Sequence, residues 1–175
     1  MQWYLDFVKA NPVLSAVIQF AVLGTLGEVI SRMITTRRSK YPFTTGQTLW
    51  KMVEWSILAV CIKYAFVGIN GFVHALMEHG MLPTVPADGI TFAFFKSALV
   101  NLQFGLFLII FHRVLDNLPL KHKNWRNLDK GMLSLLWFWI PAHTVTFSLP
   151  PDFQIGLAAL WSVVLGFILG IYNRT

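Results

Sequence analysis

The sequence predicts an all-α membrane protein, a single polytopic bundle of about five transmembrane helices that occupies residues 1–175. Three observations support this fold class. Hydrophobic residues make up 55% of the chain and charged residues 13%, whereas charged residues are about a quarter of a typical soluble domain. Five apolar runs come close to the roughly 20 residues that a helix needs to cross the hydrocarbon core. The basic residues are grouped in two blocks that alternate with connections free of Lys and Arg.

The five runs are bounded by residues that favour helix ends. The first run follows Asn11-Pro12, a capping residue with a proline at the first helical position, and ends near Ile34. The remaining runs cover about 49–76, 90–111, 132–149 and 153–172. Because backbone groups cannot be left unpaired in lipid, we expect each run to be helical.

The last two runs allow two arrangements. Pro150-Pro151-Asp152 cannot continue a helix, and it predicts a tight turn between two crossings. The fourth run, however, is short and contains Pro141 and His143. A re-entrant hairpin formed by the fourth and fifth runs is therefore an alternative to two full crossings.

The distribution of charge predicts the orientation. Basic loops are expected near residues 32–51 and 113–130, while the connections 78–88 and 150–152 contain no Lys or Arg. Basic loops stay on the cytoplasmic side, or on the equivalent side of an organelle membrane. Five crossings then place the N-terminus outside and the C-terminus inside, in a bacterial cytoplasmic membrane or an organelle inner membrane. The basic loops are expected to meet anionic lipid headgroups.

Several function classes find no support in the sequence. The net charge of +6 lies in short blocks without a basic helix or an aromatic platform, which argues against nucleic acid as a partner. The chain lacks a Gly-x-Ser-x-Gly motif, a glycine-rich phosphate loop and a clustered acid pair. His74 and His79 are five residues apart, so on a helix they point about 140° from each other and cannot share a zinc ion. No catalytic residue, metal or cofactor is predicted.

Polar residues inside the apolar runs are the candidates for function, because such a group at bilayer depth costs several kcal/mol unless it faces water or a partner. In the second run, successive spacings of seven, seven and four residues place four polar side chains on one helical stripe: Ser56, Lys63, Asn70 and His74. The stripe either lines a water-filled path or pairs with polar groups of another helix, and the sequence leaves both alternatives open.

The third run repeats this pattern. Lys96 and Gln103 are seven residues apart and share one face, while Ser97 and Asn101 share another. Lys96 is close enough to the start of the run to extend its ammonium group to the interface. Asn101 and Gln103 are deeper, so they are candidates for interhelical hydrogen bonds or solute contact. If Lys63 and Lys96 point inward, the bundle interior is positive and favours anions over cations.

Two further groups combine a polar side chain with a helix end or a kink. Glu28 and Arg32 are four residues apart in the first run, which predicts an interfacial ion pair or, together with Glu54, part of a gate. His143 lies two residues after Pro141. There it can satisfy the backbone of a kinked helix, or act as a pH-sensitive hinge.

Several different short motifs follow one another along the chain. Tyr4-Leu5 and Asn11-Pro12 precede a helix that ends in LGTLGEVIS at residues 23–31, His74 is followed by Leu82-Pro83, and the C-terminal part contains Trp139, Pro141, Phe147, Pro151 and Trp161. This series resembles the Mpv-seventeen family of small mitochondrial and peroxisomal membrane proteins, in its first helix, its second-helix histidine motif and its C-terminal signature. The resemblance implies a pore or channel for small solutes.

The chain also departs from the pattern of that family. Asn70-Gly71 replaces a Gly-Pro pair, His143 stands where glutamine is expected, and Val100-Asn101 replaces an Asp-Gln pair. The basic residue that usually comes after the final proline of the motif is absent, and Asp152 follows Pro151 here. Such departures are expected of a distant relative, for which a bacterial source is one option.

Three functions are therefore open. The first is a small-solute pore or facilitator. The second is a small membrane enzyme or lipid-modifying protein, in which Glu54, Lys63, His74 and His143 converge near one interface. The third is a non-transporting scaffold whose polar residues hold helices together. Five helices enclose only a narrow path, so a wider pore would require a homo-oligomer.

Overall fold

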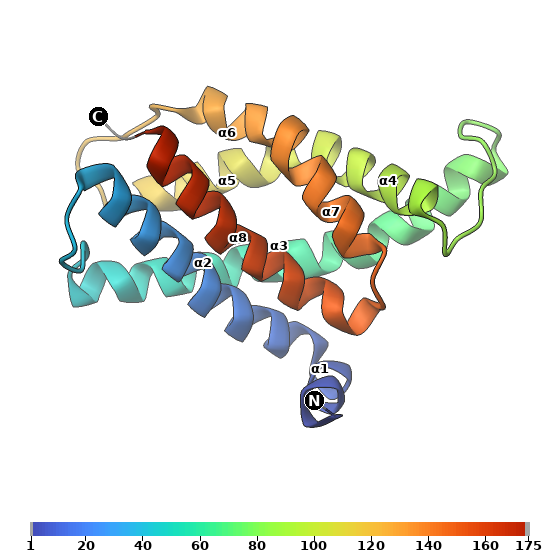
Figure 1. The fold of residues 1–175 in the computed structure, drawn as a ribbon, viewed down its shortest axis with the longest axis horizontal. Helices are drawn as coiled ribbons and strands as arrows, with labels where there is room; N and C mark the ends of the chain where they lie inside the picture. The colour runs from blue at the N-terminus through green and yellow to red at the C-terminus, as the bar shows by residue number, and fades with distance from the viewer. Residues whose placement is uncertain (1, 174–175) are drawn as a thin grey trace. The chain divides into compact units, whose positions relative to one another are not determined.

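The computed structural model describes residues 2–173, which are mostly helical (Figure 1). In chain order the segments are α1 (Gln2–Ala10), α2 (Pro12–Thr36), α3 (Thr45–Glu78), α4 (Ile90–Leu99), the π-helical η1 (Val100–Gly105), α5 (Leu106–Asn117), α6 (Leu128–Ser134), the π-helical η2 (Leu135–Trp139), α7 (Ile140–Phe147) and α8 (Pro151–Tyr172). Within residues 2–173 no strand is formed. The all-α prediction is confirmed.

Four helical stretches are long and apolar enough to cross a membrane: Pro12–Thr36, Thr45–Glu78, Ile90–Asn117 and Pro151–Tyr172. Each of them leaves large apolar side chains exposed, including Leu26, Val67, Phe107 and Phe167. Exposed apolar surface along a helix of this length is favourable against lipid and unfavourable against water. These are the features of an integral membrane protein.

The fourth predicted run is also a full-length helical stretch. α6, η2 and α7 follow one another without a break over 20 residues, which corresponds to about 30 Å at 1.5 Å per residue. α7 packs beside α4 and α6 beside α5 (Figure 1). This length favours a crossing over a short re-entrant segment, while the total of five crossings stays a prediction.

The helices extend beyond the predicted runs, so the basic connections are shorter than expected. The connections cover residues 37–44 and 118–127, and Arg32, Lys51 and Arg113 lie inside helices. The connections 79–89 and 148–150 still contain no Lys or Arg. The predicted turn around Pro151 is also displaced, because this proline begins α8, where its missing N–H leaves no hydrogen bond unmade.

The chain forms two compact units. The first unit consists of the described parts of 1–60 and 155–175, and the second unit consists of residues 61–154. α3 contributes its first half to the first unit and its second half to the second.

Glycines allow close helix packing in the first unit. A Cβ atom on Gly27 of α2 would lie 2.5 Å from the carbonyl oxygen of Ser162 in α8, and one on Gly170 would lie 3.0 Å from the Cβ of Ile34. Gly166 lies directly against the backbone of Gly27. Small residues at such positions let two backbones approach closely.

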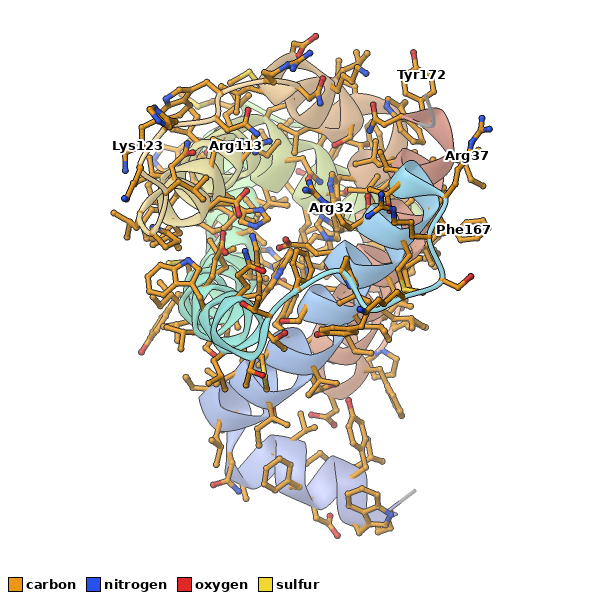
Figure 2. All side chains as sticks on the ribbon, turned by 90° about the vertical axis from the view of Figure 1, so that its left-hand side faces the viewer. Arg32, Arg37, Arg113, Lys123, Phe167 and Tyr172 are labelled. Atoms are coloured by element: carbon orange, nitrogen blue, oxygen red, sulfur yellow. The ribbon has the colours of Figure 1, made fainter. Side chains whose placement is uncertain are left out.

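α2 and α8 therefore lie side by side and run in the same direction (Figure 1). Arg37, just after α2, and Tyr172, at the end of α8, lie at the same end of the first unit (Figure 2). The first and fifth helices of a five-crossing chain must run in the same direction, so this arrangement agrees with the predicted topology. The orientation in the membrane stays a prediction.

α1 precedes α2 and turns away from its axis (Figure 1). The Tyr4 hydroxyl donates a hydrogen bond to Gln19 Oε1 of α2 at 3.0 Å. Gly156 of α8 leaves room for this pair, because a Cβ there would lie 2.6 Å from the Tyr4 hydroxyl oxygen. Trp3 is exposed, as is usual for an indole ring at a membrane interface.

In the second unit, α4 with η1 and α5 packs antiparallel to α6 with η2 and α7. The two π-helical segments face each other, and a Cβ on Gly105 of η1 would lie 2.7 Å from Leu135 Cδ2 of η2. A π-helical turn inserts a residue into the regular ladder and often marks a functional position. Arg113 and Lys123 lie near one end of this unit (Figure 2).

Candidate functional site

Polar side chains of the second unit gather between α4 and α7, next to the facing π-helical segments. We call this set the α4–α7 polar cluster, and its members are Lys96, Ser97, Asn101, His143 and Thr144. Lys96, Ser97 and Asn101 are buried, whereas His143 and Thr144 are partly buried. The spacing of four residues between Ser97 and Asn101, predicted from the sequence to share a face, places both against α7.

The carbonyl oxygen of Ile140 joins the two helices. It accepts hydrogen bonds from Ser97 Oγ of α4 at 2.6 Å and from Thr144 Oγ1 of α7 at 2.7 Å. Pro141 leaves a different carbonyl without its N–H donor, that of Trp137 one turn earlier. The two hydroxyl groups therefore do not replace the bond that the proline removes, and they link α4 to α7 at a carbonyl of α7.

Asn101 makes the second link between the helices. Its Nδ2 atom lies 2.8 Å from the carbonyl oxygen of Ser97 and 3.2 Å from His143 Nδ1. A backbone carbonyl can only accept, so the amide group that faces it is the NH₂ group, which then also donates to His143. The hydrogen-bond pattern therefore assigns a neutral His143 with its proton on Nε2.

Lys96 lies between aromatic rings. Its side chain is 7% exposed, and its Nζ atom lies 4.6 Å from the ring centroid of Phe147 and 5.8 Å from that of Phe92. Among residues 2–173 no carboxylate forms an ion pair with Lys96. Cation–π contacts with the aromatic faces hold the ammonium group inside the unit, while the expectation that it extends to the membrane interface stays a prediction.

An aromatic shell surrounds the cluster. Phe66 of α3 lies 5.3 Å from the His143 ring and 4.7 Å from the Phe147 ring, measured between centroids, and Trp139 lies 4.9 Å from His143. Apolar surroundings strengthen the electrostatic contacts of an enclosed group and raise the cost of leaving it unpaired. Inside this shell, the loss of a contact of Lys96 or His143 therefore costs more free energy than it would in water.

The cluster occupies one end of the α4–α7 contact. It lies toward the connections 79–89 and 148–150, which carry no basic residue. Further along, Gly105 and Leu135 approach so closely that their contact leaves no room for a solute. The polar part of this contact is therefore buried, and it ends where Gly105 meets Leu135.

The predicted stripe on α3 is not gathered into this cluster. Ser56 Oγ donates to the carbonyl oxygen of Met52 in its own helix, at 2.7 Å. Lys63 is partly buried, whereas Asn70 and His74 are exposed. The His74 ring lies 4.8 Å from the ring of Phe92, which also contacts Lys96. The first half of the stripe is thus partly buried and the second half is exposed, and its role in a path stays a prediction.

Gln103 is exposed and lies outside the cluster. It lines an open groove of 260 Å³ between α3 and η1, together with Ala65, Gly68, Ile69, Phe72, Leu99, Val100 and Phe104. The groove is apolar apart from Gln103, as expected for a surface that faces lipid.

The first unit contains a separate set of buried charges. Lys51 Nζ of α3 lies 2.8 Å from Glu28 Oε2 of α2 and 3.1 Å from Glu54 Oε2. Trp55 Nε1 donates to Glu28 Oε1 at 2.8 Å, and Glu54 is fully buried. We call this set the Glu28–Lys51–Glu54 ion cluster. It joins α2 to α3 and leaves the solvent-exposed Arg32 at its edge.

The sequence identified both acids but missed the lysine at their centre. The predicted partner of Glu28 was Arg32, and Lys51 was assigned to a basic loop. Lys51 and Glu54 are three residues apart on one helix, a spacing that places side chains together. Gly24, one turn before Glu28, is the second available signal, because the Trp55 ring lies directly over it. The spacing indicates the pair inside α3, whereas the contact of α3 with α2 is visible only in the structure.

Comparisons with known proteins give no relative for this arrangement: no protein-family model, no curated protein and no solved structure matches the chain. The resemblance to the Mpv-seventeen family therefore stays a prediction that rests on the motifs quoted above.

Proposed function

We propose that this membrane protein is a facilitator for small solutes with a preference for anions, and that the solute passes the α4–α7 polar cluster. The observation that carries the proposal is Lys96, a buried ammonium group without a carboxylate partner among the described residues. An uncompensated charge at membrane depth is costly, and it marks a functional position unless it is paired. A small anion that binds reversibly can supply the missing negative charge.

The backbone at this level supports a gated path. Both η1 and η2 are π-helical, and Pro141 follows η2 by two residues. Irregular turns and prolines allow helices to bend or shift without losing their remaining hydrogen bonds. A shift of α7 against α4 that separates Gly105 from Leu135 would extend the polar cluster into a continuous path. The Mpv-seventeen resemblance, which implies a small-solute pore, points to the same function.

The test is solute flux from proteoliposomes that contain the purified full chain. Neutral, anionic and cationic solutes of graded size are compared for the wild type, Lys96→Met and Lys63→Met. We expect size-limited flux with an anion preference that Lys96→Met removes. Lys63→Met tests whether the other lysine that the sequence predicts to point inward also contributes to the anion preference. Absence of flux above that of empty vesicles, with folded protein, would rule the facilitator out.

A scaffold is the second candidate, favoured by one observation. Ser97, Asn101 and Thr144 hydrogen-bond within the cluster itself, as polar residues do when they only hold helices together. If folded protein conducts nothing and Asn101→Leu merely lowers its thermal stability, this candidate replaces the facilitator.

The proposed topology can be tested with the lone Cys61 replaced by serine. Single cysteines at Ser39, Thr84 and Asn124 lie in three successive connections. With the N-terminus outside, a membrane-impermeant maleimide should label Thr84→Cys from the outside. Ser39→Cys and Asn124→Cys should be labelled only after the membrane is opened. Labelling of all three from one side would contradict this topology.

A further inference from the structure

Building on the proposed facilitator, we infer that Lys96 selects small, weakly hydrated monovalent anions, and that the Phe147 ring occupies the place such an anion takes. The chemical class is defined by one unit of negative charge spread over several atoms, as in thiocyanate or nitrate. Sulfate and phosphate, which carry more charge and bind water more tightly, are excluded.

The charge of the site sets the charge of the ligand. Lys96 is the only buried cation of the second unit among the residues that the structure describes. One ammonium group neutralises one negative charge. A dianion would keep a net charge in an apolar environment, where charge is costly. The site therefore favours monovalent anions.

The lining sets the hydration of the ligand. Phe92, Phe147 and Phe66 supply carbon faces rather than hydrogen-bond donors. The donors nearby are Lys96 Nζ and, from the assigned tautomer, His143 Nε2–H. Two donors cannot replace the shell of a strongly hydrated anion such as fluoride, but they suffice for an anion that loses its water easily.

Phe147 is the residue that an anion would displace. Its ring face, which carries the negative part of the π-electron quadrupole, covers the ammonium group at 4.6 Å. The same ring lies 6.0 Å from the His143 ring, measured between centroids, so it is next to both polar side chains. Phe147 is also the last residue of α7, before the connection 148–150, and its buried ring packs against Phe66. An anion in its place would meet Lys96 directly.

The experiment combines a binding measurement with a flux measurement on the same protein. Binding of thiocyanate to the full chain in detergent is followed by the shift of its C≡N infrared band, with sulfate, fluoride and nitrate as competitors. Flux of the same anions is measured in proteoliposomes. The variants are Lys96→Met, Lys96→Arg and Phe147→Leu. Lys121→Met, in the exposed connection 118–127, is the control that loses the same charge.

We expect nitrate to displace thiocyanate, and sulfate and fluoride to fail. Lys96→Met should lower thiocyanate flux and affinity about tenfold or more, while Lys121→Met retains both. Lys96→Arg, which keeps the positive charge, should lose less than Lys96→Met. Phe147→Leu, which uncovers the ammonium group, should raise thiocyanate affinity about threefold or more.

The two readouts separate this inference from the proposed function. Thiocyanate binding that depends on Lys96, without flux, would support the site and overturn the facilitator. Flux with sulfate preferred over thiocyanate, or with an anion order unchanged in Lys96→Met, would overturn the site and leave the facilitator standing. Absence of both binding and flux would overturn both.

Discussion

Lys51 in the first unit and Lys96 in the second are buried to a similar extent, at 9% and 7% exposure, but they have opposite surroundings. Lys51 bridges two carboxylates, whereas Lys96 faces two phenyl rings. A buried charge with its counter-charges is part of the framework, because removing one partner leaves the others uncompensated. A buried charge without a counter-ion is available to a ligand. The partner, rather than the burial or the residue type, therefore distinguishes Lys51, which has its counter-charges, from Lys96, which the proposed function assigns to an anion.

The backbones of the two units differ in the same sense. In the first unit, α2 and α8 pack glycine against backbone. In the second unit, the facing segments η1 and η2 are π-helical and a proline follows. Tight backbone packing resists movement, whereas irregular turns permit it. The paired Lys51 thus lies in the unit whose helices pack backbone against backbone. Lys96 lies in the unit that contains the π-helical turns.

The largest expected effect is on the Glu28–Lys51–Glu54 ion cluster. Lys51→Met leaves the buried Glu54 and the partly buried Glu28 without their shared ammonium group. We expect it to lower the free energy of unfolding by about 3–5 kcal/mol, measured by SDS titration in mixed micelles. Lys40→Met, in an exposed connection, should change it by less than about 0.5 kcal/mol. Equal effects of the two variants would contradict the stabilising role of the paired Lys51.

The next effect tests the rigid packing of the first unit. Gly27→Ala places a methyl group 2.5 Å from the Ser162 carbonyl oxygen, so the two helices must separate. The expected loss of unfolding free energy is about 1–3 kcal/mol, measured in the same titration. Gly68→Ala is the matched control, because a Cβ there meets no atom within 4 Å. The control should stabilise α3 by up to about 1 kcal/mol, and a loss in the control instead would show that the packing is wrongly placed.

A smaller effect of opposite sign is expected at Lys96. Lys96→Met removes an unpaired buried charge and keeps a side chain of similar length. We expect the free energy of unfolding to rise by about 1 kcal/mol relative to the wild type. The variant should also lose anion preference in the flux assay. Thermal melting in detergent, monitored by tryptophan fluorescence, provides the measurement. Destabilisation as large as that of Lys51→Met would show that Lys96 has a structural partner after all.

The smallest expected effect is the coupling between Asn101 and His143. A double-mutant cycle with Asn101→Ala and His143→Ala should give an interaction energy of about 0.6 kcal/mol, the usual size for interhelical hydrogen bonds in membranes. The unfolding free energies of the four proteins supply the cycle. A value near zero would mean that the bond at 3.2 Å contributes nothing to holding α7 against α4.

The sequence was sufficient for the features that depend on local composition. Apolar runs, a capped start at Asn11-Pro12 and the alternation of basic connections predicted the helices and their order, because length and hydropathy decide whether a segment can cross lipid. The four-residue spacing of Ser97 and Asn101 predicted a shared face, because residues four apart lie on one side of a helix. Helix ends were less accurate, since Lys51 and Arg113 belong to helices that continue past the apolar core.

Partnerships between helices were decided by the tertiary structure alone. The stripe from Ser56 to His74 and the face shared by Lys96 and Gln103 were both candidates for a path in the sequence, since both place polar residues inside apolar runs. Only the packing of α7 against α4 buries Lys96 and leaves Asn70 and His74 exposed. Periodicity tells which side chains share a face, but the energy of a charge depends on what lies opposite that face.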